Sequence, residues 1–186
     1  MAEALGLVEY ETISAGFRAA DTIAKTAEVR LLRAQVICPG KYVLLFAGEI
    51  GAVKAVLDAA RANHAERLLD SFLLGNPHPQ VTDALESAAR RDADTPCGAA
   101  LGTVEVSTVA AAVVAADMAA KAAGVQILEL RLEREVANKA YVLMRGTVSE
   151  VTEAVHCAAR RAEEAGTLLD SAVLPNPDEK FWKTLL

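Results

Sequence analysis

The cysteines of this chain are its candidates for thiol or metal chemistry, since their thiols are expected to be reduced or to bind a metal. The chain has three cysteines, Cys38, Cys97 and Cys157, without CxxC spacing, so the pattern does not indicate a disulfide framework. Cys38 precedes Pro39 and Gly40, which favour a tight turn. A lone cysteine before such a turn is usually an ordinary small apolar residue.

Two lysines recur in matching contexts. Lys25 follows Asp21 by four residues, and Lys121 follows Asp117 by the same interval. On a helix this spacing predicts an i,i+4 ion pair.

The sequence contains no GxSxG, P-loop or helix-opening GxGxxG, and its histidines lack the HExxH or paired spacing of a metal site. It therefore predicts a protein that is not an enzyme.

The sequence repeats itself, which indicates a tandem duplication of a compact unit. Segments of the first half return in the second; the pairs are Leu5-Gly6-Leu7-Val8-Glu9 with Leu101-Gly102-Thr103-Val104-Glu105, Asp70-Ser71 with Asp170-Ser171, and Asn76-Pro77 with Asn176-Pro177. We predict a first domain at 1–89, a polar linker at 90–99 and a second domain at 100–186. The halves differ at the turn, where Cys38-Pro39-Gly40-Lys41 faces Val136-Ala137-Asn138-Lys139.

Each half predicts the element order β-α-β-β-α-β. In the first half, the expected strands are 4–11, 29–37, 42–47 and 68–74. Apolar residues at helical spacing, beginning with Ile13, Phe17, Ala20 and Ala24, predict its first helix. In the second half, leucines alternate with Glu129, Arg131 and Glu133, as in a strand with one buried face. A short amphipathic segment at 178–186 is expected to dock on its own or a neighbouring subunit.

Composition excludes several classes of partner. The net charge of −6 and a pI near 5.1 argue against phosphate-driven binding of nucleic acid or an anionic membrane. Aromatic residues make up only 4%, which leaves little surface for stacking bases. We expect no nucleic-acid partner, no membrane partner and no export signal.

The combined motifs resemble the bacterial microcompartment (BMC) shell domain. The residues that carry the resemblance are Leu-Gly-x-Val-Glu, the Ala-Asp-x-x-x-Lys of the first helix, Gly48 to Ala55, and the closing strand that runs into Asn-Pro. Two such domains in one chain are similar to tandem-domain shell proteins, in which three chains form a flat pseudohexameric tile. The resemblance implies an α/β (α+β, ferredoxin-like-related) fold with two unpermuted BMC domains, located in a microcompartment shell within the cytoplasm.

The resemblance also assigns residues to a pore and to the tile edge. It implies that the pore is lined by Cys38, Pro39, Gly40, Val136, Ala137 and Asn138. The Cys-Pro-Gly-Lys turn resembles the subtype of propanediol-utilising compartments, whose equivalent cysteines hold an iron–sulfur cluster on the threefold axis. That implies one [4Fe-4S] cluster per homotrimer, bound by Cys38, for electron transfer across the shell with a luminal or cytosolic redox enzyme. Lys25 and Lys121 would contact other shell proteins edge to edge.

Two other functions fit the same residues. Cys38 can be a plain pore residue in a tile with a metal-free metabolite pore. The β-α-β-β-α-β repeat also suits a ferredoxin-like trimer that binds a regulatory ligand.

Overall fold

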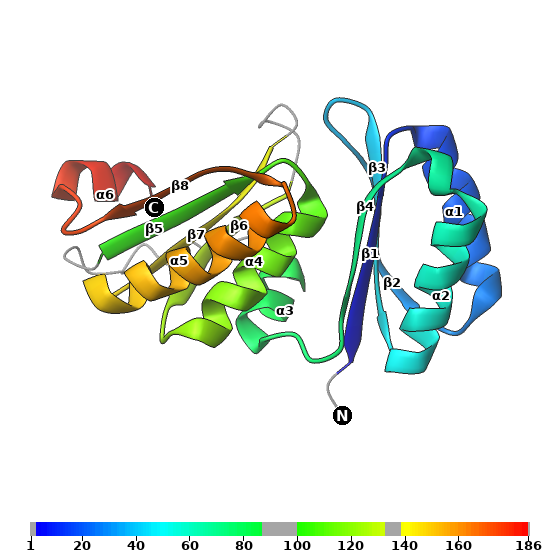
Figure 1. Ribbon diagram of the computed structural model, residues 1–186, viewed down its shortest axis with the longest axis horizontal. Coiled ribbons are helices and arrows are strands. Elements are labelled where there is room, and N and C mark those ends of the chain that lie inside the picture. The colour runs from blue at the N-terminus through cyan, green and yellow to red at the C-terminus, as the bar shows by residue number, and fades with distance from the viewer. Residues whose placement is uncertain (1–2, 87–99, 133–138, 186) are drawn as a thin grey trace. The chain divides into compact units, whose positions relative to one another are not determined.

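The computed structural model describes residues 3–86, 100–132 and 139–185, which form two compact units (Figure 1). The first unit holds the described residues up to Pro77 together with residues 108–110, and the second holds the other described residues. Each unit contains a four-stranded antiparallel sheet, in the orders β2-β3-β1-β4 and β6-β7-β5-β8. None of the described helices is both long and apolar enough to cross a membrane.

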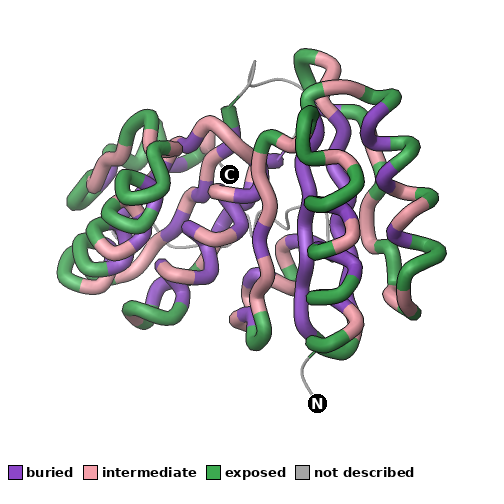
Figure 2. The backbone as a smooth tube through the Cα atoms, turned by 45° about the vertical axis from the view of Figure 1, so that its right-hand side comes forward, coloured by how far each residue is buried: buried purple, intermediate pink, exposed green. Residues whose placement is uncertain are grey.

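The first unit follows the predicted order. Its elements are β1 (Ala4–Tyr10), α1 (Ile13–Thr26), β2 (Arg30–Ile37), β3 (Lys41–Gly48), α2 (Ile50–Asn63), the 3-10 turn η1 (Ala65–Arg67) and β4 (Leu68–Leu74). Helices α1 and α2 cover one face of the sheet (Figure 1). Strand β1 is buried along its whole length (Figure 2), so both faces of this strand are shielded from water.

The second unit repeats that order. Its elements are α3 (Pro79–Glu86), β5 (Ala100–Val106), α4 (Val109–Ala122), β6 (Gln126–Arg131), β7 (Ala140–Gly146), α5 (Val148–Glu164), β8 (Leu168–Leu174) and α6 (Glu179–Leu185). Only the first two residues of α4 group with the first unit. Gln80 of α3 bonds the edge of this sheet, since its side chain accepts from Ile127 N at 2.8 Å and donates to Val125 O at 2.9 Å. The fold class predicted from the sequence is confirmed. The expected linker at 90–99 lies outside the described residues, so the domain boundaries stay a prediction.

The buried face of α1 differs from the one suggested by its apolar spacing. Ile13 and Phe17 are 37% and 60% exposed, whereas the buried residues of this helix are Ala15, Gly16, Ala19 and Ile23. The helix packs closely against β3: a Cβ added at Gly16 would come within 2.3 Å of the Tyr42 ring. Small side chains therefore form the contact, because larger ones would hold the helix away from the strand.

Strand β6 also departs from the alternation that the sequence suggested. Leu128 and Leu130 are buried as predicted, but Glu129 is only 5% exposed. Tyr141 donates a hydrogen bond to Glu129 Oε2 at 2.8 Å, and Arg131 pairs with the other carboxylate oxygen. A buried carboxylate needs such partners because desolvation penalises its charge. Glu133 lies outside the described residues.

Candidate functional site

Cys38 lies at the tip of the turn between β2 and β3. Gly40 N donates to Ile37 O at 2.8 Å, which closes a four-residue turn with a cis bond between Cys38 and Pro39. Gly40 has φ of +111°, a conformation that favours glycine. The Cys38 thiol is free and exposed. The turn therefore presents a sulfur atom to solvent on a short, hydrogen-bonded support.

An ion pair fixes the base of this turn. Lys41, the first residue of β3, lies 2.9 Å from Glu9 Oε1, and the Glu9 side chain is fully buried. In the second unit, the corresponding Lys139 lies 3.5 Å from Glu105, whose side chain is 36% exposed. Both sheets thus use a lysine at the start of β3 or directly before β7 to neutralise a glutamate of the central strand, but only the first pair is desolvated.

Val136, Ala137 and Asn138, predicted to line the pore, lie outside the described residues, as does Cys97. Cys157 is half-buried in α5. Within the described part of the chain, no three His, Cys, Asp or Glu side chains gather as a metal site. At the turn between β2 and β3, one chain therefore has the thiol of Cys38 as its candidate metal ligand.

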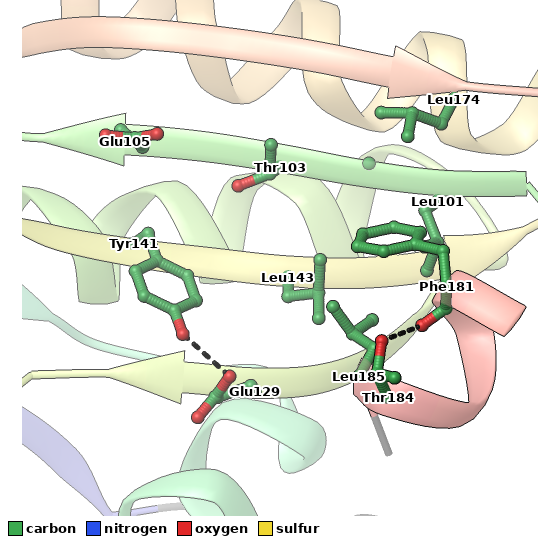
Figure 3. Close-up of a pocket in the computed structure, with 11 residues that line it drawn as sticks. Leu101, Thr103, Glu105, Glu129, Tyr141, Leu143, Leu174, Phe181, Thr184 and Leu185 are labelled. Atoms are coloured by element: carbon green, nitrogen blue, oxygen red, sulfur yellow. Dashed lines mark hydrogen bonds between the residues drawn. The ribbon is translucent and has the colours of Figure 1, made fainter. Parts of the chain in front are cut away.

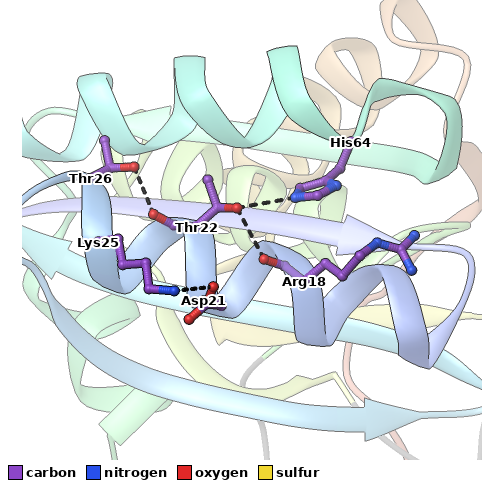
Figure 4. A network of polar contacts seen from close by, with 6 residues as sticks. All are labelled: Arg18, Asp21, Thr22, Lys25, Thr26 and His64. Carbon is purple, nitrogen blue, oxygen red and sulfur yellow. Dashed lines mark hydrogen bonds and ion pairs between the residues drawn. The ribbon is translucent and has the colours of Figure 1, made fainter.

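The two predicted lysine ion pairs are present, but their environments differ. Lys25 lies 2.6 Å from Asp21, and the two side chains are 73% and 64% exposed (Figure 4). Lys121 lies equally close to Asp117, but the Asp117 side chain is only 4% exposed. Asp117 also accepts a hydrogen bond from His78 N at 2.7 Å. The ion pairs are confirmed, and the location of both lysines at the tile edge stays a prediction.

This difference predicts unequal mutational costs. We expect Asp117→Ala to lower the free energy of unfolding by about 1 to 3 kcal/mol, because it removes the acceptor of a partly buried N–H and of an ammonium. The matched change Asp21→Ala should cost about 0.5 kcal/mol or less, as for exposed pairs in general. Urea denaturation of both variants at neutral pH measures the two values, and equal losses would contradict the structural distinction.

Sequence reasoning did not predict a cavity of about 360 Å³ in the second unit (Figure 3). Helix α6 packs on the sheet of its own unit, with Trp182 buried against Leu101 and Leu128. The cavity opens beside this helix, with apolar residues at one end and Glu105, Glu129 and Tyr141 at the other. The remaining lining residues are Leu101, Gly102, Thr103, Leu143, Leu174, Phe181, Thr184 and Leu185.

The polar end of the cavity has a perturbed tyrosine. Burial, followed by the hydrogen bond to Glu129 and the negative charge of that carboxylate, raises the pKa of Tyr141 above its ordinary value of 10.0. The phenol therefore stays protonated and continues to donate to Glu129 at neutral pH. No signal in the sequence indicated this pair, because Glu129 occupies a position that alternation assigns to solvent.

Comparison with known proteins places this architecture in one family. The model of the BMC domain matches residues 4–77 and 100–177, which together make up most of the chain. The chain therefore belongs to the BMC-domain family, and it carries two such domains in tandem.

Similarity to relatives along their whole length shows which kind of BMC-domain protein this chain resembles. The chain is 35% identical over 189 residues to the bacterial microcompartment shell protein PduT of Citrobacter freundii, covering 100% of this chain and 99% of that protein. It is 28% identical to the carboxysome assembly protein CcmO of Synechococcus elongatus over 99% of this chain and 69% of that protein. The crystal structure of a microcompartment protein from Desulfitobacterium hafniense superposes with a TM-score of 0.82 and 37% identity, over 98% of this chain and 99% of that one. The chain is a structural protein of a microcompartment shell that resembles the PduT type, and it is not an enzyme.

Proposed function

We propose that three copies of this chain form a pseudohexameric shell tile, and that their Cys38 thiolates bind one [4Fe-4S] cluster at its centre. The observation that carries the proposal is the free, exposed thiol at the tip of a hydrogen-bonded turn. The full-length similarity to a PduT shell protein supports the pseudohexameric assembly. Each chain has two BMC domains, so a trimer would contain six similar units.

The residues of the turn suit such a cluster. Threefold symmetry would bring three thiolates together and leave one iron for a ligand that the protein does not supply. A Cβ at Gly40 would meet no atom within 4 Å, so the turn leaves room for neighbouring copies to approach. A bound cluster would supply one-electron exchange, which would let the tile pass electrons between the two sides of the shell to a luminal or cytosolic redox enzyme.

The same proposal assigns the other predicted site residues to the pore and to the edge of the tile. Pro39 and Gly40 would surround the cluster together with Val136, Ala137 and Asn138 of the second turn. Lys25 and Lys121 would contact other shell proteins at the edge. The Lys25 side chain is highly exposed although it pairs with Asp21, and this exposure suits a residue that contacts another tile.

Anaerobic purification of the full chain tests the proposal. We expect native mass spectrometry to find three chains, and chemical analysis to find about four iron and four sulfide per trimer, with visible absorption. A trimer that stays free of iron after anaerobic reconstitution with iron and sulfide would overturn the cluster in favour of a metal-free metabolite pore. A monomer at all concentrations would overturn the tile itself.

A further inference from the structure

Each sheet carries two carboxylates side by side. Glu9 of β1 is the neighbour of Asp70 in β4, and Glu105 of β5 is the neighbour of Asp170 in β8. In both sheets the next residue, a serine, donates its backbone N–H to the aspartate, at 2.7 Å in the first sheet and 2.8 Å in the second. The two carboxylate pairs are therefore structural counterparts created by the duplication.

The first pair holds the start of a helix. Glu9 accepts a hydrogen bond from Val109 N at 2.8 Å, and Asp70 accepts one from Thr108 Oγ1 at 2.5 Å. Residues 108–110 belong to the same compact unit as these carboxylates, and Val109 is the first residue of α4. Acidic side chains stabilise a helix N-terminus because they satisfy its unpaired N–H groups and oppose the helix dipole.

The second pair has no helix start bound to it in the described part of the chain. Glu105 is 36% exposed, whereas the Glu9 side chain is fully buried. Asp170 is exposed. Strand β5 is half-buried at Thr103 and Glu105, although its counterpart β1 is buried throughout. This face of the second sheet is therefore incompletely covered.

Helix α1 has the complementary exposed surface. Thr12 follows Glu9 by three residues, just as Thr108 follows Glu105, so Thr12 and Ile13 correspond to Thr108 and Val109. Among the described residues, the Ile13 N–H has no acceptor. Ile13 and Phe17 are 37% and 60% exposed, whereas their counterparts Val109 and Val113 are 4% and 0% exposed.

We infer that Glu105 and Asp170 of one copy bind Thr12 and Ile13, at the start of α1, in a second copy of this chain. The inference rests on the proposed trimer and names the residues of its subunit contact. The neighbouring copy would then cover Ile13 and Phe17, which are exposed at the start of α1. Such a contact joins two different surfaces, so it repeats head to tail, and in the proposed trimer three such contacts close a ring.

The first test removes both carboxylates. We expect the double variant Glu105→Ala with Asp170→Ala to raise the concentration at which the trimer dissociates by tenfold or more, measured by analytical ultracentrifugation, because two hydrogen bonds to charged acceptors are lost. Glu153→Ala with Glu163→Ala, on the exposed side of α5, is the matched control and should leave dissociation unchanged. Circular dichroism establishes that both variants fold.

The second test does not depend on stability. Thr12→Cys combined with Asp170→Cys should form disulfides between chains on oxidation and give covalent trimers on a non-reducing gel. Thr12→Cys with Glu153→Cys keeps the same native cysteines and should not. The contact would be overturned, with the trimer still established, if the double-alanine variant dissociates like its control and Thr12→Cys with Asp170→Cys gives no linked chains. A monomeric wild type would instead overturn the proposed tile.

Discussion

Replacing Cys38 by serine is expected to abolish bound iron and visible colour while leaving the fold and the trimer intact. A serine hydroxyl is a poor substitute for the thiolate that iron–sulfur clusters require. The Cys38 side chain is exposed, so the substitution should change the free energy of unfolding by no more than about 0.5 kcal/mol. Iron analysis, visible spectroscopy and native mass spectrometry of anaerobically prepared protein measure the three properties.

The matched control for this prediction is Cys157→Ser. Cys157 is half-buried in α5, so its replacement can affect packing, but iron content per trimer should stay at the wild-type value. Iron retained in Cys38→Ser, or lost equally in both variants, would show that the cluster depends on other ligands.

Replacing Gly6 by valine is expected to lower the free energy of unfolding by about 3 kcal/mol or more. A Cβ at this position would come within 2.4 Å of the Phe46 ring and 2.8 Å of Val53 Cγ1, both in the core of the first unit. Valine suits a strand by intrinsic preference, so the loss would report overpacking rather than poor strand formation. Chemical denaturation followed by circular dichroism gives the value.

Gly48→Val is the control for this effect. Gly48 ends the adjacent strand β3, and a Cβ added there would meet no atom closer than 3.5 Å. We expect a change within about 1 kcal/mol. The corresponding Gly102→Val should be as damaging as Gly6→Val, because Val151 and Val155 of α5 lie 2.6 Å from the added carbon. Similar losses at Gly6 and Gly48 would contradict close helix packing as the reason for glycine in the Leu-Gly motif.

Much of the fold follows from local signals in the sequence. Strands β4 and β8 begin and end where their apolar runs and the Asn-Pro stops predicted, and the Pro39-Gly40 turn joins two strands as expected. These features are predictable because turn residues act through their own backbone preferences. The same is true of the Lys25 and Lys121 ion pairs, which need only helical spacing.

Which surfaces are covered, and by what, was decided only by the tertiary structure. Periodicity identified an apolar stripe at Ile13 and Phe17, but the core contacts Ala15, Ala19 and Ile23. Alternation assigned Glu129 to solvent, but Tyr141 and Arg131 hold it in a buried site. In both cases the sequence alone determined the element and its pattern. The buried face depended on close approach between distant segments, because burial is a property of the packed surroundings and not of one segment's residues.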